Sequence, residues 1–304
     1  MSDKLIISYL KGGFGNQMQQ YATALAIATK MDAKLKVDLS FFEKEEYREL
    51  YKMDKINVNI EQATQSEIER LKNEPNAPLI YRVLKKIGIS SKYRKNTDIC
   101  ALFGFKPDKR ITELNHSAYL SGWCSAEVYV REIQHLLIDQ FQPKSNLSQC
   151  ANQLSEKIKS TNAISIHIRR GDFLDLQHFF RIVPIEYYKT AVNEISKKIQ
   201  NPQFFIFSND QKWANENIDF VHNPIFVDLT SCEKYTGYAD VEEFELMKRC
   251  KHNIIGNSSF SWWAAYLNYN KEKIVIAPKK WFNDKFYQES LEQYPLCPSD
   301  WLQF

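Results

Sequence analysis

The second half of the chain alternates short apolar runs with longer segments of helical character. The apolar runs occupy residues 163–168, 203–207, 225–227 and 273–277, and their length and composition are typical of buried strands. A helix is predicted before the first run, at 147–159, and two more are predicted between the runs, at 184–198 and 240–251. This alternation predicts an α/β fold in which helices cover a parallel sheet.

The first 40 residues predict a strand, a glycine-rich turn, a helix and a second strand, at 5–10, 11–17, 17–30 and 34–39. Gly12, Gly13 and Gly15 crowd the turn, and glycine lets a backbone bend sharply and approach a ligand closely. Met18 occupies the position of the last glycine in G-x-G-x-x-G, so the dinucleotide fingerprint is absent. The alternative interpretation is a tight turn that binds no ligand.

The length of 304 residues suits two domains, each large enough for its own core. Residues 142–146, Gln-Pro-Lys-Ser-Asn, are the best linker candidate. We therefore predict an N-terminal domain at 1–143 and a C-terminal domain at 144–304.

Two adjacent arginines follow the strand at 163–168, in the order Arg169, Arg170, Gly171 and Asp172. Two guanidinium groups at the end of a buried strand are costly to desolvate without a partner, and their planar forks match phosphate oxygens. Open parallel sheets bind ligands at the carboxyl ends of their strands, so the position favours a phosphate site. The competing interpretation is a structural clamp in which Asp172 holds one arginine.

Two other groups are candidates for the same site. His167 shares a strand face with Arg169, where it either binds a ligand or is a satisfied core histidine. Asn257, Ser258 and Ser259 follow a strand at a predicted helix start, where free N–H groups and hydroxyls favour an anion. For Ser258 the alternative is a simple helix cap, and both roles are compatible.

Composition narrows the class of protein. The formal net charge is only +3, which argues against general nucleic-acid binding. No segment reads as a signal peptide or a membrane span, so a cytoplasmic location is expected and the six scattered cysteines are interpreted as reduced thiols. Residues 79–95 carry six basic residues and no acid; they either contact an anionic inner-membrane surface or, as the pattern favours, form a solvated face.

Several absent motifs favour a site that neutralises phosphate without a metal. No D-x-D pair, no Walker A glycine spacing, no H-E-x-x-H and no G-x-S-x-G occur in the sequence. We therefore expect neither a metal nor another cofactor.

Four motifs in order resemble glycosyltransferase family 11, the α-1,2-fucosyltransferases, in its bacterial form. They are G-G-F-G-N-Q at 12–17, H-I-R-R-G-D at 167–172, S-N-D-x-x-W at 208–213 and N-S-S-F-S-W-W-A-A at 257–265. The resemblance covers about the first 40 residues and most of 160–278. Residues 40–115 and the tail after Trp281 match nothing in the family pattern, and acceptor choice is expected to depend on them.

The resemblance implies a GT-B-like fold, with two Rossmann-like domains facing across a cleft. The N-terminal domain would take the acceptor and the C-terminal domain the donor, GDP-β-L-fucose. Fucose would pass, with inversion and without a metal, to the 2-hydroxyl of a terminal β-galactoside on an oligosaccharide or lipid-linked glycan. The implied donor-site residues are Gly15, Asn16, His167, Arg169, Arg170, Ser258, Ser259 and Phe260.

Arg169 and Asp172 are the implied catalytic residues. Arg169 placed at the donor β-phosphate would stabilise charge that develops on the departing GDP. Asp172 is the carboxylate nearest in sequence, although it is also a candidate to orient Arg170. The residues leave two rival functions open, a GT-B transferase that uses another nucleotide sugar and a non-catalytic glycan-binding protein with a decayed transferase fold.

Overall fold

The computed structural model describes residues 4–72, 98–101, 105–122, 127–232 and 238–304. They form two compact units, Met1–Tyr51 with Val58–Ile133, and Lys52–Asn57 with Gln134–Phe304. The change of unit falls at 133/134, ten residues before the expected boundary. Segment 134–143 joins the second unit because Lys248 Nζ donates to the carbonyl of Phe141 at 2.7 Å and Gln134 Nε2 donates to Tyr266 O at 2.9 Å. The basic segment 79–95 lies entirely outside the described residues.

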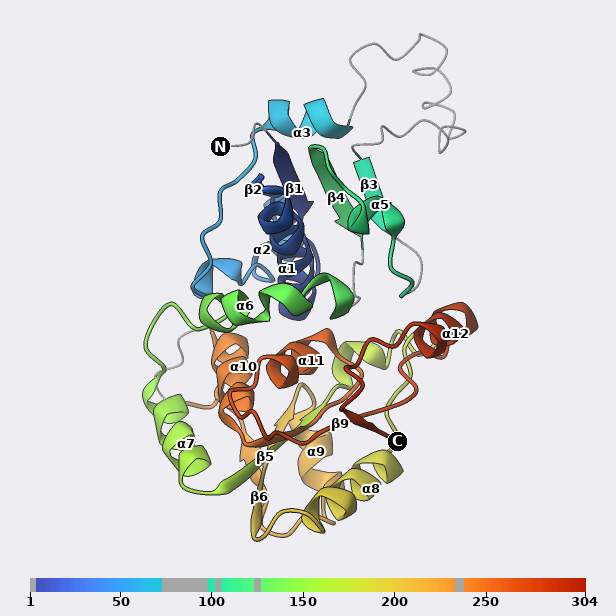
Figure 1. The fold of residues 1–304 in the computed structure, drawn as a ribbon. Helices are drawn as coiled ribbons and strands as arrows, with labels where there is room; N and C mark the ends of the chain where they lie inside the picture. The colour runs from blue at the N-terminus through green and yellow to red at the C-terminus, as the bar shows by residue number, and fades with distance from the viewer. Residues whose placement is uncertain (1–3, 73–97, 102–104, 123–126, 233–237) are drawn as a thin grey trace. The chain divides into compact units, whose positions relative to one another are not determined.

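The first unit contains a four-stranded parallel sheet in the order β2-β1-β4-β3 (Figure 1). Its strands are β1 (Leu5–Tyr9), β2 (Lys34–Asp38), β3 (Asp98–Ala101) and β4 (Ala118–Gly122). Its helical elements are α1 (Phe14–Met31), η1 (Ser40–Glu43), α2 (Glu45–Arg48), α3 (Gln65–Lys72), α5 (Lys109–Thr112), η3 (Glu127–Tyr129) and η4 (Arg131–Ile133). Successive residues of β1 pack in different clusters, Ile6 with Ala24 of α1 and Ile7 with Ile68 of α3.

Helix α1 begins three residues earlier than the sequence pattern predicts. Gly13 is its N-cap residue, and the N–H groups of Asn16 and Gln17 both donate to Gly13 O, at 3.0 and 3.1 Å. Gly15 and Asn16 therefore lie in the first helical turn and not in the preceding loop. Of the three glycines in this turn, only Gly12 has a left-handed φ, at 76°, where glycine carries no steric cost.

The second unit contains a six-stranded parallel sheet in the order β10-β9-β8-β5-β6-β7. Its strands are β5 (Asn162–Ile168), β6 (Pro202–Ser208), β7 (Ile225–Val227), β8 (His252–Ile254), β9 (Val275–Ala277) and β10 (Leu302–Gln303). Its helical elements are η2 (Met53–Lys55), α6 (Gln134–Gln140), α7 (Gln149–Lys159), η5 (Gly171–Phe173), α8 (Ile185–Ser196), α9 (Gln211–Asn217), α10 (Ala239–Arg249), α11 (Ser259–Tyr266) and α12 (Lys285–Gln293). The predicted α/β alternation is confirmed.

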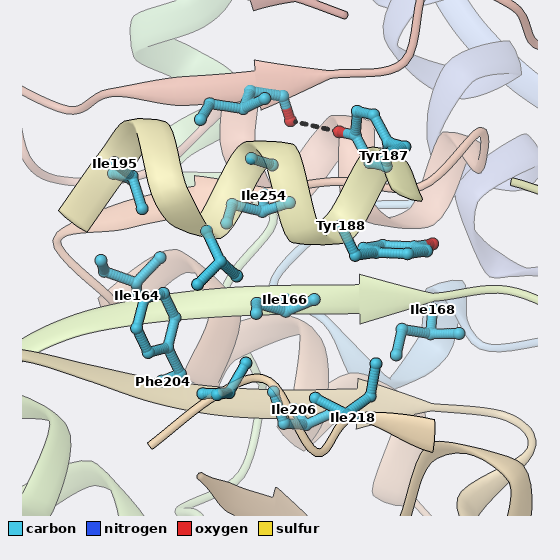
Figure 2. Close-up of a cluster of buried hydrophobic side chains, with 14 of the residues drawn as sticks. Ile164, Ile166, Ile168, Tyr187, Tyr188, Ile195, Phe204, Ile206, Ile218 and Ile254 are labelled. Atoms are coloured by element: carbon cyan, nitrogen blue, oxygen red, sulfur yellow. Dashed lines mark hydrogen bonds between the residues drawn. The ribbon is translucent and has the colours of Figure 1, made fainter. Parts of the chain in front are cut away.

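The core of this unit lies where α8 packs against β5 and β6. Figure 2 shows α8 above β5, with Tyr188 over the part of β5 that carries Ile166 and with Ile195 at the other end of the helix, while Ile206 of β6 lies below Ile166 in the same cluster. All four side chains are fully buried or nearly so. Burying such a side chain stabilises the fold by about 1.5–3 kcal/mol. This packing anchors β5, which lies between β8 and β6 in the sheet.

Cys150, in the first turn of α7, and Cys232, after β7, form a disulfide, with their Cα atoms 6.6 Å apart. The interpretation of all six cysteines as reduced thiols is wrong for this pair. The two residues are 82 positions apart in sequence, and only the folded chain brings them together. Cys250 and Cys297 are buried free thiols. In the part of the chain that the structure describes, no helix is long and apolar enough to cross a membrane.

Candidate active site

The two arginines leave the sheet at the carboxyl end of β5, between β8 and β6. The register pairs Ile166 with Ile254 of β8 and Ile168 with Ser208 of β6, so all three strands end at one edge. The chain then turns through η5, where the N–H of Phe173 donates to Arg170 O at 2.7 Å. A central strand end in a parallel sheet is the position at which such folds bind ligands.

Arg169 is held at one end of its guanidinium group. Its Nη2 donates to Asp172 at 2.9 Å, while the group lies 5.5 Å from the Phe173 ring centroid. Its Nε is buried and has no hydrogen-bond partner among the described residues. The side chain is 32% exposed and that of Asp172 52%, so this ion pair is partly solvated. A buried donor without a partner is costly, which makes Arg169 a candidate for binding an anion.

Arg170 has different neighbours from those expected. Its guanidinium carbon lies 4.1 Å from the Trp213 ring centroid, and its Nε lies 3.5 Å from Asp210 Oδ2. The expectation that Asp172 orients Arg170 is therefore wrong, because Asp172 pairs with Arg169. The clamp interpretation does hold for Arg169, although through one terminal nitrogen only.

His167 is a buried, neutral histidine. Burial, together with the positive charge of Arg169, lowers the pKa of His167 to about 3. Its ring lies 5.6 Å from that of Phe260, and its Nδ1 has no partner within the described part of the chain. The imidazole is thus available for one neutral hydrogen bond at the end of β5.

The segment that follows β8 packs directly against the end of β5. A Cβ on Gly256 would lie 3.1 Å from His167 O and 3.7 Å from Arg169 N, so a side chain there would press the two segments apart by a few tenths of an ångström. Ser258 caps α11 by accepting the N–H of Phe260 at 3.3 Å. Asn257 Nδ2 donates to the carbonyls of Arg181 and Trp281, which fixes the segment. The structure thus brings the 257–260 motif beside His167 and Arg169, as expected.

Gly15 and Asn16 belong to the first unit, at the start of α1. Two side chains of α1 hold the preceding loop in place. Gln17 Nε2 donates to Gly12 O at 2.8 Å, and Gln20 Oε1 accepts the N–H of Lys11 at 2.9 Å. No side chain caps this helix. The local geometry therefore presents a helix N-terminus in a glycine-rich loop, which suits an anion or a hydroxyl.

A group of carboxylates near the end of β7 was not predicted from the sequence. Burial, with Asp240 and Asp228 nearby, raises the pKa of Glu243 to about 8. One sequence feature could have pointed to this group of carboxylates: Asp228 directly follows the last residue of a strand, β7. Within the described ranges, no three His, Cys, Asp or Glu side chains form a group that could hold a metal ion.

Comparisons with known proteins agree on one family. The sequence pattern of the family described as Glycosyl transferase family 11 matches residues 3–301. An alpha-1,2-colitosyltransferase of Escherichia coli is 29% identical, over 98% of both chains. The O-antigen biosynthesis glycosyltransferase WbnK of Escherichia coli is also 29% identical, over 90% of this chain and 94% of its own. The mouse galactoside alpha-(1,2)-fucosyltransferase 1 is 26% identical over 84% of this chain and 61% of its own.

Solved structures show the same fold at low sequence identity. The fucosyltransferase NodZ from Bradyrhizobium superposes with a TM-score of 0.52 at 14% identity, over 87% of this chain and 93% of its own. POFUT1 in complex with GDP-fucose gives a TM-score of 0.51 at 11% identity, over 90% and 98%. The predicted GT-B-like α/β class, with a parallel sheet in each unit, is confirmed.

Proposed function

Because the chain belongs to glycosyl transferase family 11 and is a glycosyltransferase, we propose that it transfers L-fucose from GDP-β-L-fucose to the 2-hydroxyl of a terminal β-galactoside. Transfer inverts the anomeric centre and uses no metal. The second unit binds the donor and the first unit contributes to the acceptor side. The alpha-(1,2) linkage and the galactoside acceptor are supported by the names of the relatives.

The observation that carries this proposal is the state of Arg169. Its guanidinium lies at the end of the central strand, with one terminal nitrogen on Asp172 and a buried Nε that no described residue satisfies. Breaking the bond between sugar and phosphate leaves negative charge on the departing GDP, while the sugar becomes oxocarbenium-like. A preorganised guanidinium at the β-phosphate stabilises that charge as it develops, which is the task a divalent metal performs in other transferases.

The neighbouring groups supply neutral contacts to the donor. His167 offers an uncharged ring nitrogen, and Ser258, Ser259 and Phe260 bring the N-terminus of α11 to the same edge. The partial positive charge of that helix end adds to the field of Arg169. Gly15 and Asn16 are the proposed donor contacts of the first unit.

Colitose is the second candidate for the transferred sugar, because one of the most similar relatives is an alpha-1,2-colitosyltransferase. Colitose is fucose without the 3-hydroxyl. A site that hydrogen-bonds that hydroxyl rejects the deoxy sugar strongly, whereas an apolar site discriminates weakly. GDP-fucose and GDP-colitose would occupy the same phosphate site. Only their relative rates of turnover can therefore tell which one is the donor.

The test is a donor screen with purified protein and a β-galactoside acceptor. GDP-fucose, GDP-colitose and UDP-galactose are supplied separately, and release of nucleotide is followed. We expect release from GDP-fucose and none from UDP-galactose. A kcat/KM for GDP-colitose well above that for GDP-fucose would replace fucose by colitose. Release from neither GDP donor would overturn the proposal and favour a non-catalytic glycan-binding protein.

A further inference from the structure

Asn209, the first residue after β6, contacts both ends of the turn that carries the arginines. Its Oδ1 accepts the backbone N–H of Arg170 at 2.9 Å, and its Nδ2 donates to Asp172 Oδ1 at 3.3 Å. The register of β5 and β6 runs to the pair Ile168 and Ser208, so Asn209 leaves the sheet beside Arg169. One amide thereby fixes the backbone before Gly171 and the carboxylate after it.

Gly171 makes room for this amide. A Cβ on Gly171 would lie 2.3 Å from Asn209 Nδ2 and 3.1 Å from its Cγ. The φ of Gly171 is not in the left-handed region, so alanine meets no backbone penalty there. The amide of Asn209 is the obstacle, and the bare backbone at 171 and the amide at 209 form one structural feature.

We infer that Asn209 is a positioning residue for Arg169, which it orients through Asp172. This inference rests on the proposed function, in which Arg169 binds the donor phosphate. Asp172 is half exposed and holds Arg169 by one N–H. The amide of Asn209 keeps that carboxylate from rotating into solvent. The guanidinium of Arg169 is therefore preorganised in the orientation that the phosphate requires.

These contacts are solvated and contribute little to folding stability, because exposed polar pairs have small net free energies. A positioning role and a structural role therefore predict different results. Loss of positioning lowers kcat while the melting temperature stays near that of the wild type. Loss of a structural contact lowers both together.

The first arm of the test is a double-mutant cycle with GDP-fucose as donor. We expect Asn209→Ala to lower kcat roughly tenfold to a hundredfold, by analogy with the loss seen when a hydrogen-bond partner that orients a metal ligand is removed. Gly171→Ala causes a similar loss because its methyl group displaces the amide. The double variant equals Asn209→Ala within about twofold, since no amide remains to be displaced. Effects that multiply would overturn the inference.

The matched control is Asn215→Ala. Asn215 is an exposed asparagine of α9 whose Nδ2 donates to Gln211 O at 2.8 Å. Its kcat should stay within about twofold of the wild type. A loss of kcat in Asn209→Ala that only tracks a fall in melting temperature would assign Asn209 a structural role and overturn the inference.

The second arm needs no donor. The Nε–H resonance of Arg169 is assigned by its disappearance in Arg169→Lys, and its chemical shift and solvent exchange are compared between the wild type and Asn209→Ala. We expect a changed shift and faster exchange in Asn209→Ala. An unchanged resonance would overturn the inference whatever the kinetics. A changed resonance in a protein that turns over neither GDP donor would sustain it while the proposed function fails.

Discussion

Arg169 and Arg170 are adjacent in sequence, yet their guanidinium groups have different surroundings. The Arg169 side chain is one-third exposed and its guanidinium pairs with Asp172, whereas the guanidinium of Arg170 lies over the Trp213 ring beside Asp210. Successive residues leaving a strand point to opposite sides, which explains the separation. The two residues should therefore respond differently to the same substitution.

Arg169→Ala should lower kcat roughly a hundred- to thousandfold, because one preorganised donor to developing negative charge is removed. Arg169→Lys should also be badly impaired, since lysine keeps the charge but loses the planar fork. Both variants should remain folded, because the guanidinium is not part of the core. Near-normal turnover of Arg169→Lys would refute the phosphate role, and an unfolded Arg169→Ala would favour a purely structural clamp.

Arg170→Ala is the control for this pair. It removes a guanidinium stacked on an aromatic ring, an interaction that contributes about 0.5–2 kcal/mol. We therefore expect a lower melting temperature as well as some loss of activity. Kinetics and thermal melts of the three variants, measured side by side, separate the two roles.

His167 should make stability depend on pH. Its pKa is about 3 in the folded protein, against 6.5 for an ordinary histidine, so the unfolded chain binds the proton more readily between these values. Its neutral form therefore contributes stability fully above pH 6.5, and that contribution is lost as the pH falls toward 3. We compare the free energies of unfolding of the wild type and His167→Gln by urea titration at pH 7 and pH 5. The difference between the two proteins should be smaller at pH 5 than at pH 7. A difference that does not change with pH would contradict this account.

The sequence allowed Arg169, His167 and Ser258 to be assigned to one site because His167 lies at the end of a predicted strand and Arg169 and Ser258 follow predicted strands of a parallel sheet. It did not reveal which carboxylate each arginine contacts. Asp172 and Asp210 both lie near the arginines, and the choice between them depends on the turn at Gly171 and on the aromatic surface of Trp213. Such choices depend on side-chain packing between segments that are distant in sequence.

At the scale of elements, the strands at 163–168 and 203–207 were predicted within one residue of their bounds, as β5 and β6. The order of the strands in the sheet was not predicted, because the pairing of β5 with β8 depends on packing and not on a local sequence pattern. The helix predicted at 240–251 is α10, which starts one residue earlier, at Ala239, with Tyr238 as N-cap residue and no side-chain cap.

The disulfide between α7 and the segment after β7 gives a test at this scale. A disulfide typically contributes about 2–4 kcal/mol to stability, chiefly by restricting the unfolded chain, and this one joins residues 82 positions apart. Reducing agent should lower the melting temperature of the wild type, and Cys150→Ser should have that lower value with or without reductant. If the melting temperature of the wild type were the same with and without reductant, the disulfide between Cys150 and Cys232 would be contradicted.

At the scale of the whole molecule, the proposed mechanism assigns charge stabilisation to arginine and helix N-termini. The rate of transfer should therefore be unchanged in excess EDTA. Activity lost on chelation and restored by Mn²⁺ or Mg²⁺ would contradict the metal-independent mechanism.

The linkage of the product tests the central claim most directly. Purified protein is incubated with GDP-fucose and a β-galactoside disaccharide, and the product is analysed by two-dimensional NMR. We expect one new α-anomeric fucose signal, from the β-linked donor, with a correlation across the glycosidic bond to carbon 2 of galactose. A β-fucoside, or fucose on another hydroxyl, would contradict the proposed inverting transfer to the 2-hydroxyl.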